Sequence, residues 1–246
     1  MEYSKPQDIL FEDSRIDKLK EIAKDPYVVK NFFSREEIRY INEQKEKCEE
    51  VGKFGKVVNW KYNKNNELKE WLENKFKQTL ELDFTMHGGN YFQTNVPFYV
   101  HTDTSKNEIP GMIPYKNIVV PLTQSTEEHK CYTVVFKQRW FGEATMFWKG
   151  PVFLTAKSNY NHKVEDYTTL ENYTGTDISV GDYTRFLTHL PYNNLHGLSV
   201  HSVYEWNIGD IIIFDCTQLH SSNDFTTSGN VTPKFALSYF CRLKDE

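Results

Sequence analysis

The feature that most restricts the fold of this chain is a series of short apolar runs that begins after Leu80. Five of them are rich in β-branched and aromatic residues and are separated by polar residues, glycine or proline: NYFQTNVPFYVH, KNIVVPL, KCYTVVF, GDIIIFD and PKFALSYFCRL. Runs of this length and composition predict buried strands. Many short strands bury their apolar sides only in a barrel or in two stacked sheets, so we expect one of these two folds.

Two helices are predicted before these runs. Ser34 and Glu37 have the S-x-x-E spacing of a capping box, so a helix should begin there. From about Glu67 to Leu80, apolar residues recur at helical spacing and form one stripe. We expect the apolar side of each helix to pack against the β structure from outside.

The bulk properties argue against several classes of protein. The formal net charge is −5 and no long basic tract is present, so nucleic acid is not an expected partner. No apolar stretch approaches the roughly 20 residues of a membrane span, and the N-terminus is polar. The four cysteines contain no C-x-x-C pair. We therefore expect a cytoplasmic protein with free thiols and no membrane segment.

A candidate metal site begins with His101 and Asp103, at the end of the first run. Side chains two positions apart on a strand point to the same side, so the imidazole and the carboxylate should project together. A second histidine would complete a set of two histidines and one carboxylate, which leaves three coordination positions open and suits non-haem Fe(II) oxygenases. The pair alone is weak evidence, because such pairs also arise by chance.

His220 and Lys234 strengthen this interpretation. His220 follows the buried run GDIIIFD, which would place it at the mouth of a barrel. Lys234 lies within an otherwise apolar run, and a buried ammonium group should have an anionic partner. The separation between the two is short, so we expect a hairpin to bring Lys234 close to His220.

The order of these motifs resembles that of the Fe(II)- and 2-oxoglutarate-dependent oxygenase superfamily. H-x-D comes first, GDIIIFD with the following LH comes second, and a basic residue on the next strand comes third. The segment VVKNFFSREEI is similar to the entry helix of the superfamily's prolyl-hydroxylase-like members. The resemblance covers about residues 27–123 and 200–243. It implies an α+β, mainly β fold: a double-stranded β-helix, or distorted jelly roll, with N-terminal helices packed on the outside.

On this basis, residues 1–246 are expected to form a single oxygenase-like domain. Its expected parts are a helical N-terminal support at 26–82, a jelly-roll core at 83–123 and 200–243, and an insert or lid at 124–199. The insert is rich in Tyr, Thr and Asn, and binding loops on a rigid scaffold often determine specificity.

The resemblance also implies roles for individual residues. His101, Asp103 and His220 would bind Fe(II), and Lys234 would bind the distal carboxylate of 2-oxoglutarate, with no catalytic residue beyond the metal ligands. Three further residues are candidates for binding this cosubstrate: Tyr91, Tyr99 and Ser238. Many members carry Arg followed two positions later by Ser or Thr, whereas Ala236 stands there in this chain. Arg242 shares the strand parity of Lys234 but would lie about 26 Å along the strand, too far to serve the same site.

The implied reaction is hydroxylation of an unidentified polar small molecule or peptide by O₂, with conversion of 2-oxoglutarate to succinate and CO₂. Related halogenases lack the carboxylate ligand, so the presence of Asp103 favours hydroxylation. Two other interpretations stay open. A cupin-like metal enzyme without 2-oxoglutarate would need no buried cation at Lys234. In a non-catalytic jelly-roll protein, structural or carbohydrate-binding, the His-Asp-His set would be a coincidence.

Overall fold

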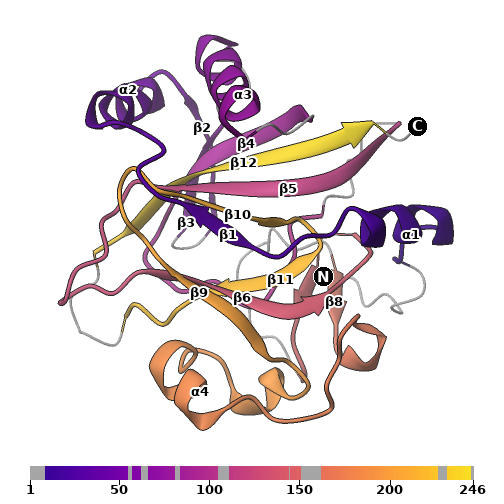
Figure 1. Cartoon of the computed structure of the whole chain (residues 1–246). Helices are drawn as coiled ribbons and strands as arrows, with labels where there is room; N and C mark the ends of the chain where they lie inside the picture. Colours follow the sequence, from indigo (N-terminus) through magenta and orange to yellow (C-terminus); the bar gives the residue numbers. More distant parts are fainter. Residues whose placement is uncertain are drawn as a thin grey trace.

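The structure is a computed structural model, and it describes residues 9–54, 57–61, 66–80, 84–104, 111–143, 145–150, 162–226 and 232–244. Two antiparallel sheets lie one above the other, and two helices cover the outer side of the larger sheet (Figure 1). The fold is therefore mainly β with added helices, as the sequence predicts.

The larger sheet, here the major sheet, has seven strands in the order β1-β10-β5-β12-β4-β3-β2. Every neighbouring pair in it is antiparallel. Its strands have these bounds: β1 Tyr27–Val29, β2 Glu49–Phe54, β3 Val57–Lys61, β4 Thr85–Thr94, β5 Met112–Pro121, β10 Ile211–Asp215 and β12 Lys234–Lys244. The central strands β5 and β12 are long and largely buried, which is why their sequences are nearly continuous apolar runs.

The smaller sheet, here the minor sheet, has three strands in the order β11-β6-β9, with bounds Gln218–Ser222, Tyr132–Arg139 and Val200–Glu205. His101 extends this sheet through an antiparallel bridge to His220 on β11. A separate parallel pair joins β7 (Thr145–Phe147) to β8 (His162–Val164).

The strand order is that of a double-stranded β-helix. Successive segments pass between the sheets: β4 in the major sheet, His101 in the minor, β5 in the major, β6 and β9 in the minor, β10 in the major, β11 in the minor and β12 in the major. The jelly-roll fold expected from the resemblance is thus confirmed by the connectivity.

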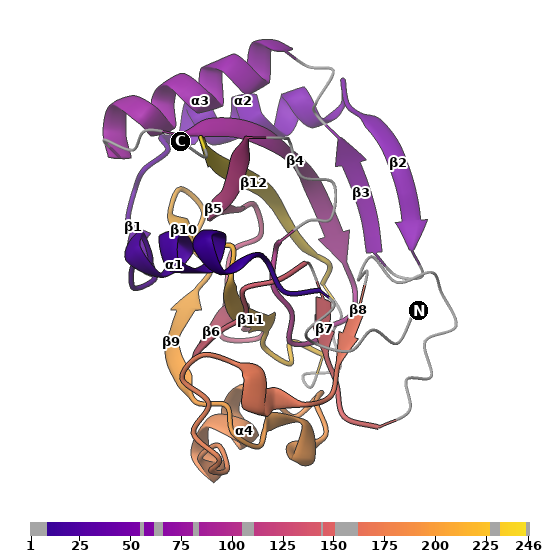
Figure 2. The same ribbon diagram turned by 90° about the vertical axis from the view of Figure 1, so that its right-hand side faces the viewer.

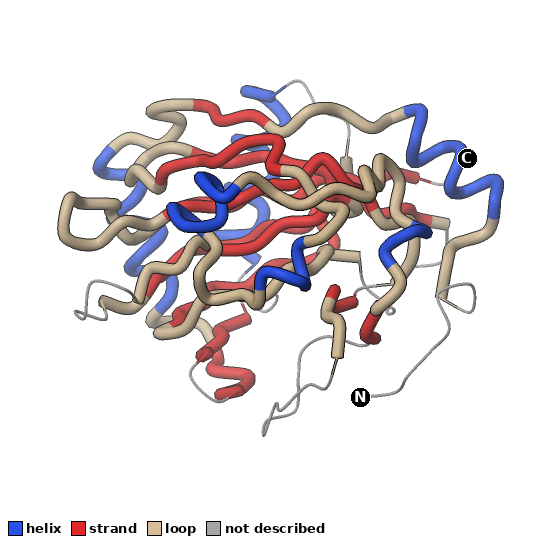
Figure 3. The backbone as a smooth tube through the Cα atoms, turned by 90° about the horizontal axis from the view of Figure 1, so that it is seen from below, coloured by secondary structure: helices blue, strands red, loops and turns tan. Residues whose placement is uncertain are grey.

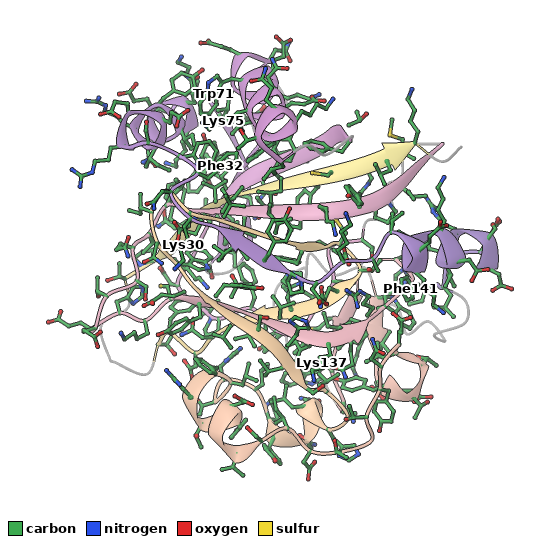
Figure 4. All side chains as sticks on the ribbon, viewed as in Figure 1. Lys30, Phe32, Trp71, Lys75, Lys137 and Phe141 are labelled. Carbon is green, nitrogen blue, oxygen red and sulfur yellow. The ribbon has the colours of Figure 1, made fainter. Side chains whose placement is uncertain are left out.

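Helices α2 (Arg35–Lys45) and α3 (Asn66–Leu80) lie where the sequence predicts them, on the outer side of the major sheet (Figure 2). Ser34 and Glu37 form the predicted capping box. Phe32, Trp71 and Lys75 lie in this layer (Figure 4), and the Lys75 ammonium is 2.6 Å from the Glu37 carboxylate. Helix α1 (Asp13–Glu21) is a further helix that the sequence analysis did not predict.

The outer side of the minor sheet is covered differently. Loops and short helices from the chain between β8 and β9 lie over it (Figure 3). These elements are η2 (Tyr167–Thr169), α4 (Val180–Phe186) and η3 (Tyr192–Leu195). None of the helices in the described ranges is long and apolar enough to cross a membrane.

Three expectations about the organisation need correction. Strand β6 falls inside the expected insert at 124–199, yet it is the central strand of the minor sheet. The expected helical support at 26–82 also contributes β1, β2 and β3 to the major sheet. Strands β11 and β12 belong to different sheets and form no hairpin, so the hairpin expected between His220 and Lys234 is wrong.

The turn before β10 is one place where the backbone requires glycine. Gly209 has a φ of 97°, and a Cβ there would lie 2.9 Å from the carbonyl oxygen of Phe33. The Phe33 amide in turn donates to the Gly209 carbonyl at 2.9 Å. This close contact joins the segment before α2 to the start of β10, which leads to the candidate site.

Candidate metal centre

The structure brings three of the predicted residues together inside the barrel. One ligand atom from each of His101, Asp103 and His220 lies within 4.8 Å of the others. The backbone amides of His101 and His220 each donate to the other residue's carbonyl, both at 3.0 Å. The Asp103 amide donates to the carbonyl of Cys216, between β10 and β11, at 3.0 Å. Backbone pairing therefore holds the H-x-D segment beside the strand that carries the third side chain.

Both imidazole rings are oriented by a hydrogen bond from Nδ1 to a backbone carbonyl oxygen. Nδ1 of His101 lies 2.7 Å from the carbonyl oxygen of Tyr99, and Nδ1 of His220 lies 3.1 Å from that of Gln218. A carbonyl oxygen only accepts, so each Nδ1 must carry the donated proton. Each Nε2 then faces Asp103, at 3.8 Å for His101 and 3.2 Å for His220. In this tautomer, Nε2 of a neutral ring carries the lone pair that can bind a metal.

The protonation states suit metal binding. Burial, together with the nearby His220, lowers the pKa of His101 to about 4, so this imidazole is neutral at neutral pH. Burial alone would raise the pKa of Asp103, but His220, His101 and the hydrogen bond from Asn117 outweigh it, and the net shift is downward. A lone pair on His101 and an ionised carboxylate therefore face each other, an arrangement that a cation stabilises.

Asn117, on β5, is a site residue that was not among those predicted from the sequence. Its side-chain amide donates to Oδ2 of Asp103, so it helps to orient the carboxylate. Its own carbonyl oxygen is buried without a hydrogen-bond partner in the described part of the chain. The available signal was an amide directly before the apolar residues IVVPL, in the first strand run after the H-x-D segment.

Lys234 lies in the barrel interior at the start of β12 and is only 1 % exposed. Its ammonium donates to the carbonyl of Tyr132 at 2.6 Å and lies 3.9 Å from the centre of the Trp206 ring. Within the described ranges, no carboxylate lies within ion-pair distance of it, so the protein anion expected from the sequence is not found. Burial lowers the pKa of Lys234 to about 7. A buried cation held by a carbonyl and an aromatic ring is suited to bind an anion from solution.

The three other predicted cosubstrate residues lie in different environments. Ser238 is buried on β12 with the strand parity of Lys234, hence on the same inward side. Tyr99 contributes its carbonyl to His101, while its ring packs against Trp148 with centroids 4.9 Å apart. Its side chain therefore belongs to the hydrophobic cluster around the minor sheet.

The prediction that Tyr91 binds the cosubstrate is wrong, because its side chain points away from the barrel interior. Its hydroxyl donates to the carbonyl of Ile41 on α2 at 2.6 Å, and its ring belongs to the hydrophobic cluster between the major sheet and the helices. Tyr91 pairs with Leu237 in the sheet, and directly opposed residues on neighbouring strands point to the same side. Both point to the helices, away from His101.

The donor set fits a particular kind of metal ion. Two imidazole nitrogens and one carboxylate oxygen on one side of a site suit Fe(II) with three positions left for other ligands. Within the described ranges, no thiol joins the cluster. Cys216 lies beside it and accepts a hydrogen bond from the Asp103 amide through its backbone carbonyl. The hydrophobic rings of Phe98 and Phe214 lie 6.0 and 4.5 Å from His101 and His220, so the surroundings are largely apolar.

Comparison with family models and with curated proteins by sequence gave no match. The fold is similar to that of the epimerase SnoN with Fe³⁺, alpha-ketoglutarate and nogalamycin RO, at 10 % identity and a TM-score of 0.49, over 94 % of this chain and 84 % of SnoN. It is also similar to HygX from Streptomyces hygroscopicus with nickel, 2-oxoglutarate and hygromycin B, at 12 % identity and a TM-score of 0.47, over 94 % and 87 %.

A third similar structure is an oxidoreductase of the 2OG-Fe(II) oxygenase family from Burkholderia pseudomallei. Its identity is 10 % and its TM-score 0.46, over 100 % of this chain and 92 % of that one. Because all three TM-scores lie below 0.5, the fold assignment rests on the strand order described above.

Proposed function

We propose that this protein is an Fe(II)- and 2-oxoglutarate-dependent dioxygenase that hydroxylates a polar substrate and releases succinate and CO₂. The observation that carries the proposal is the convergence of His101, Asp103 and His220, with both histidine Nε2 atoms turned toward the carboxylate. When bound, Fe(II) with 2-oxoglutarate supplies the activation of O₂ that such an oxidation needs.

In this proposal each protein residue has a limited role. His101, Asp103 and His220 hold the metal, and the carbonyls behind the two imidazoles keep the correct tautomer. Asn117 keeps the Asp103 carboxylate oriented through its amide. The rings of Phe98 and Phe214 contact the two imidazoles and help to hold them in place.

Lys234 is proposed to hold the distal carboxylate of 2-oxoglutarate. The ammonium is buried without a protein carboxylate within the described ranges, and an anionic ligand would supply the missing charge. Ser238, on the same side of β12, is proposed to face the cosubstrate between Lys234 and the metal.

The reaction outcome and the subgroup belong to the same proposal. The carboxylate ligand Asp103 and the similarity of VVKNFFSREEI to the entry helix of prolyl-hydroxylase-like members are the reasons for proposing a hydroxylase. The whole chain is proposed to act as one domain.

The test is anaerobic addition of Fe(II) and 2-oxoglutarate to the metal-free protein. We expect a weak visible charge-transfer band, and His101→Ala should abolish it. His196→Ala is a matched control, because His196 is partly exposed and pairs with Asp177 outside the cluster, and it should keep the band. Succinate release in air with candidate amino acids, sugars and peptides then identifies the substrate.

The same experiment separates the alternatives. A cupin-like enzyme would bind Fe(II) without a band on addition of 2-oxoglutarate, and a non-catalytic protein would bind neither. Lys234→Met should weaken binding of 2-oxoglutarate by about 30-fold or more, since it removes one partner of a buried charge pair. Lys234→Arg should retain most of the affinity, since the charge is kept.

A further inference from the structure

Four cations are buried in the described part of the chain, and they fall into two pairs. Lys116 and Lys163 each lie against a carboxylate, Asp215 and Glu165 respectively. Lys234 and Arg242 have no carboxylate within ion-pair distance among the described residues. The two cations without a carboxylate are both on β12.

The surroundings of Arg242 do not balance its charge. The side chain is 2 % exposed, and Nη1 contacts the sulfur of Cys216 at 3.9 Å and the carbonyl oxygen of Cys241 at 3.2 Å. Nε is buried with no hydrogen-bond partner in the described ranges. Burial raises the pKa of the Cys216 thiol to about 12, so Cys216 stays protonated and supplies no negative charge. Guanidinium groups in such positions normally bind a carboxylate or a phosphate in two-pronged geometry.

The position of Arg242 relative to the candidate metal centre is specific. Its neighbour Cys216 accepts the backbone hydrogen bond of Asp103 at 3.0 Å. On β12, Phe240 pairs with Asn117, whose amide holds the Asp103 carboxylate, and Phe240 lies between Lys234 and Arg242. On β12, the level of Asn117 therefore lies between the two cations, two residues from Arg242 and six residues from Lys234. They are eight residues apart, about 26 Å along the strand, so one small diacid does not bridge them.

We propose that Arg242 is a second anion-binding residue, which holds a carboxylate or phosphate group of the substrate on the side of the metal centre opposite Lys234. The inference rests on the proposed function, because it assigns the Lys234 end to 2-oxoglutarate and leaves the Arg242 end for the substrate. It restricts the substrate class to anionic organic molecules. A buried guanidinium without a counter-charge lowers the stability of the free protein, and binding of an anionic ligand explains why such a residue is present.

The test measures thermal unfolding of the full chain with three probes: sodium acetate, inorganic phosphate, and 2-oxoglutarate with Fe(II) under anaerobic conditions. Chloride at the same ionic strength is the reference. Acetate and phosphate are tested in the Lys234→Met background, so that binding at Lys234 does not contribute. We expect at least one of them to raise the unfolding midpoint by about 2–4 °C. Adding Arg242→Met should remove this rise, and adding Arg242→Lys should keep most of it.

The outcomes separate the two proposals. A rise with acetate alone indicates a carboxylate substrate, and a rise with phosphate alone a phosphorylated one. If neither anion raises the midpoint, or if the rise survives Arg242→Met, the assignment of Arg242 is wrong. A large loss of stability of Arg242→Met in chloride would identify a structural arginine and also contradict it. Stabilisation by Fe(II) with 2-oxoglutarate should persist in the single variant Arg242→Met; its absence from the wild type would contradict the proposed function instead.

Discussion

The two sides of the major sheet carry different kinds of residue, and the side chains of β12 show the difference within one strand. Leu237, Tyr239 and Cys241 point to the helices and are fully buried in one hydrophobic cluster. Lys234 and Arg242 alternate with them, point into the barrel, and are buried without a carboxylate in the described ranges. The helix side of the strand carries side chains of the hydrophobic cluster, whereas the inner side carries cations whose charge a bound anion would balance.

This difference indicates that residues on the helix side contribute mainly to stability and residues on the inner side mainly to ligand binding. The helix side closes the sheet with ring contacts such as that of Phe76 with Tyr239, whose centroids are 4.8 Å apart. The inner side carries the His-Asp-His cluster and the amide oxygen of Asn117, which has no hydrogen-bond partner among the described residues. Buried charges without a counter-charge reduce stability, so the two cations without a carboxylate in the described ranges indicate a functional interior. Variants of each side should therefore affect one property and spare the other.

The largest effect on stability is expected on the helix side. Phe76 is completely buried between the sheet and the helices and stacks on Phe32 with centroids 5.5 Å apart. Phe76→Ala should lower the free energy of unfolding by about 3–5 kcal/mol, because it leaves a cavity in a packed cluster. Urea unfolding measures the loss. Fe(II) affinity of the folded protein should stay the same, and a parallel loss of metal binding would show that the two sides are coupled.

The largest effect on binding is expected on the inner side. Asp103→Ala removes one of three ligands and should weaken Fe(II) binding more than about 100-fold, since even outer partners of metal ligands cost 10–100-fold. Anaerobic titration with Fe(II) measures the affinity. Urea unfolding without metal should show little loss of stability, because the removed carboxylate faces His101 rather than the hydrophobic clusters. Unchanged Fe(II) affinity would contradict the proposed metal centre.

A smaller effect is expected from pH. The pKa of Lys234 is lowered from 10.5 to about 7 by burial, so above pH 7 the free folded protein loses this proton and the unfolded chain keeps it. Unfolding therefore takes up a proton between pH 7 and 10.5, and stability from this group rises with pH in that range. Binding of an anion needs the ammonium, so affinity for 2-oxoglutarate should fall about 5-fold from pH 7 to pH 8.

Calorimetry in buffers of different ionisation enthalpy measures the proton taken up on binding of 2-oxoglutarate. Two histidines near Lys234 should not contribute, because burial lowers the pKa of His189 to about 4 and also lowers that of His129. Lys234→Arg serves as the control, since its charge does not titrate in this range. If affinity does not change with pH in the wild type, the ammonium of Lys234 does not bind the cosubstrate.

The smallest effect concerns Tyr91, on the helix side. Tyr91→Phe removes the hydrogen bond to Ile41 and should lower the free energy of unfolding by about 1 kcal/mol. The affinity for 2-oxoglutarate should stay at the wild-type value, because the hydroxyl lies on the opposite side of the sheet from Lys234. A weaker binding of 2-oxoglutarate in this variant would restore the sequence-based role of Tyr91 and remove the contrast between the two sides.

Local patterns in the sequence were sufficient for much of the fold and for part of the site. The capping box of Ser34 and Glu37 depends on four adjacent residues, so the start of α2 was predictable. His101 and Asp103 are two positions apart, and strand periodicity alone places them on one side. The apolar runs predicted β5, β10 and β12 because these strands are buried on both sides.

Other features depend on pairing between distant segments. Strand β11 has the sequence QLHSS, which has no strand signal of its own, and it forms because β6 and the His101 bridge pair with it. The direction of Tyr91 depends on its register with Leu237, and a shift by one residue would reverse it.

By itself, the sequence determined the chemical groups available to this protein: two imidazoles, a carboxylate and buried cations on strands of known periodicity. Only the tertiary structure decided which of them meet. The reason is that strand alternation specifies two sides but not which side faces the barrel interior, and that choice follows from register and sheet order. The same geometry distinguishes Lys116, which meets Asp215, from Lys234 and Arg242, which meet no carboxylate in the described chain.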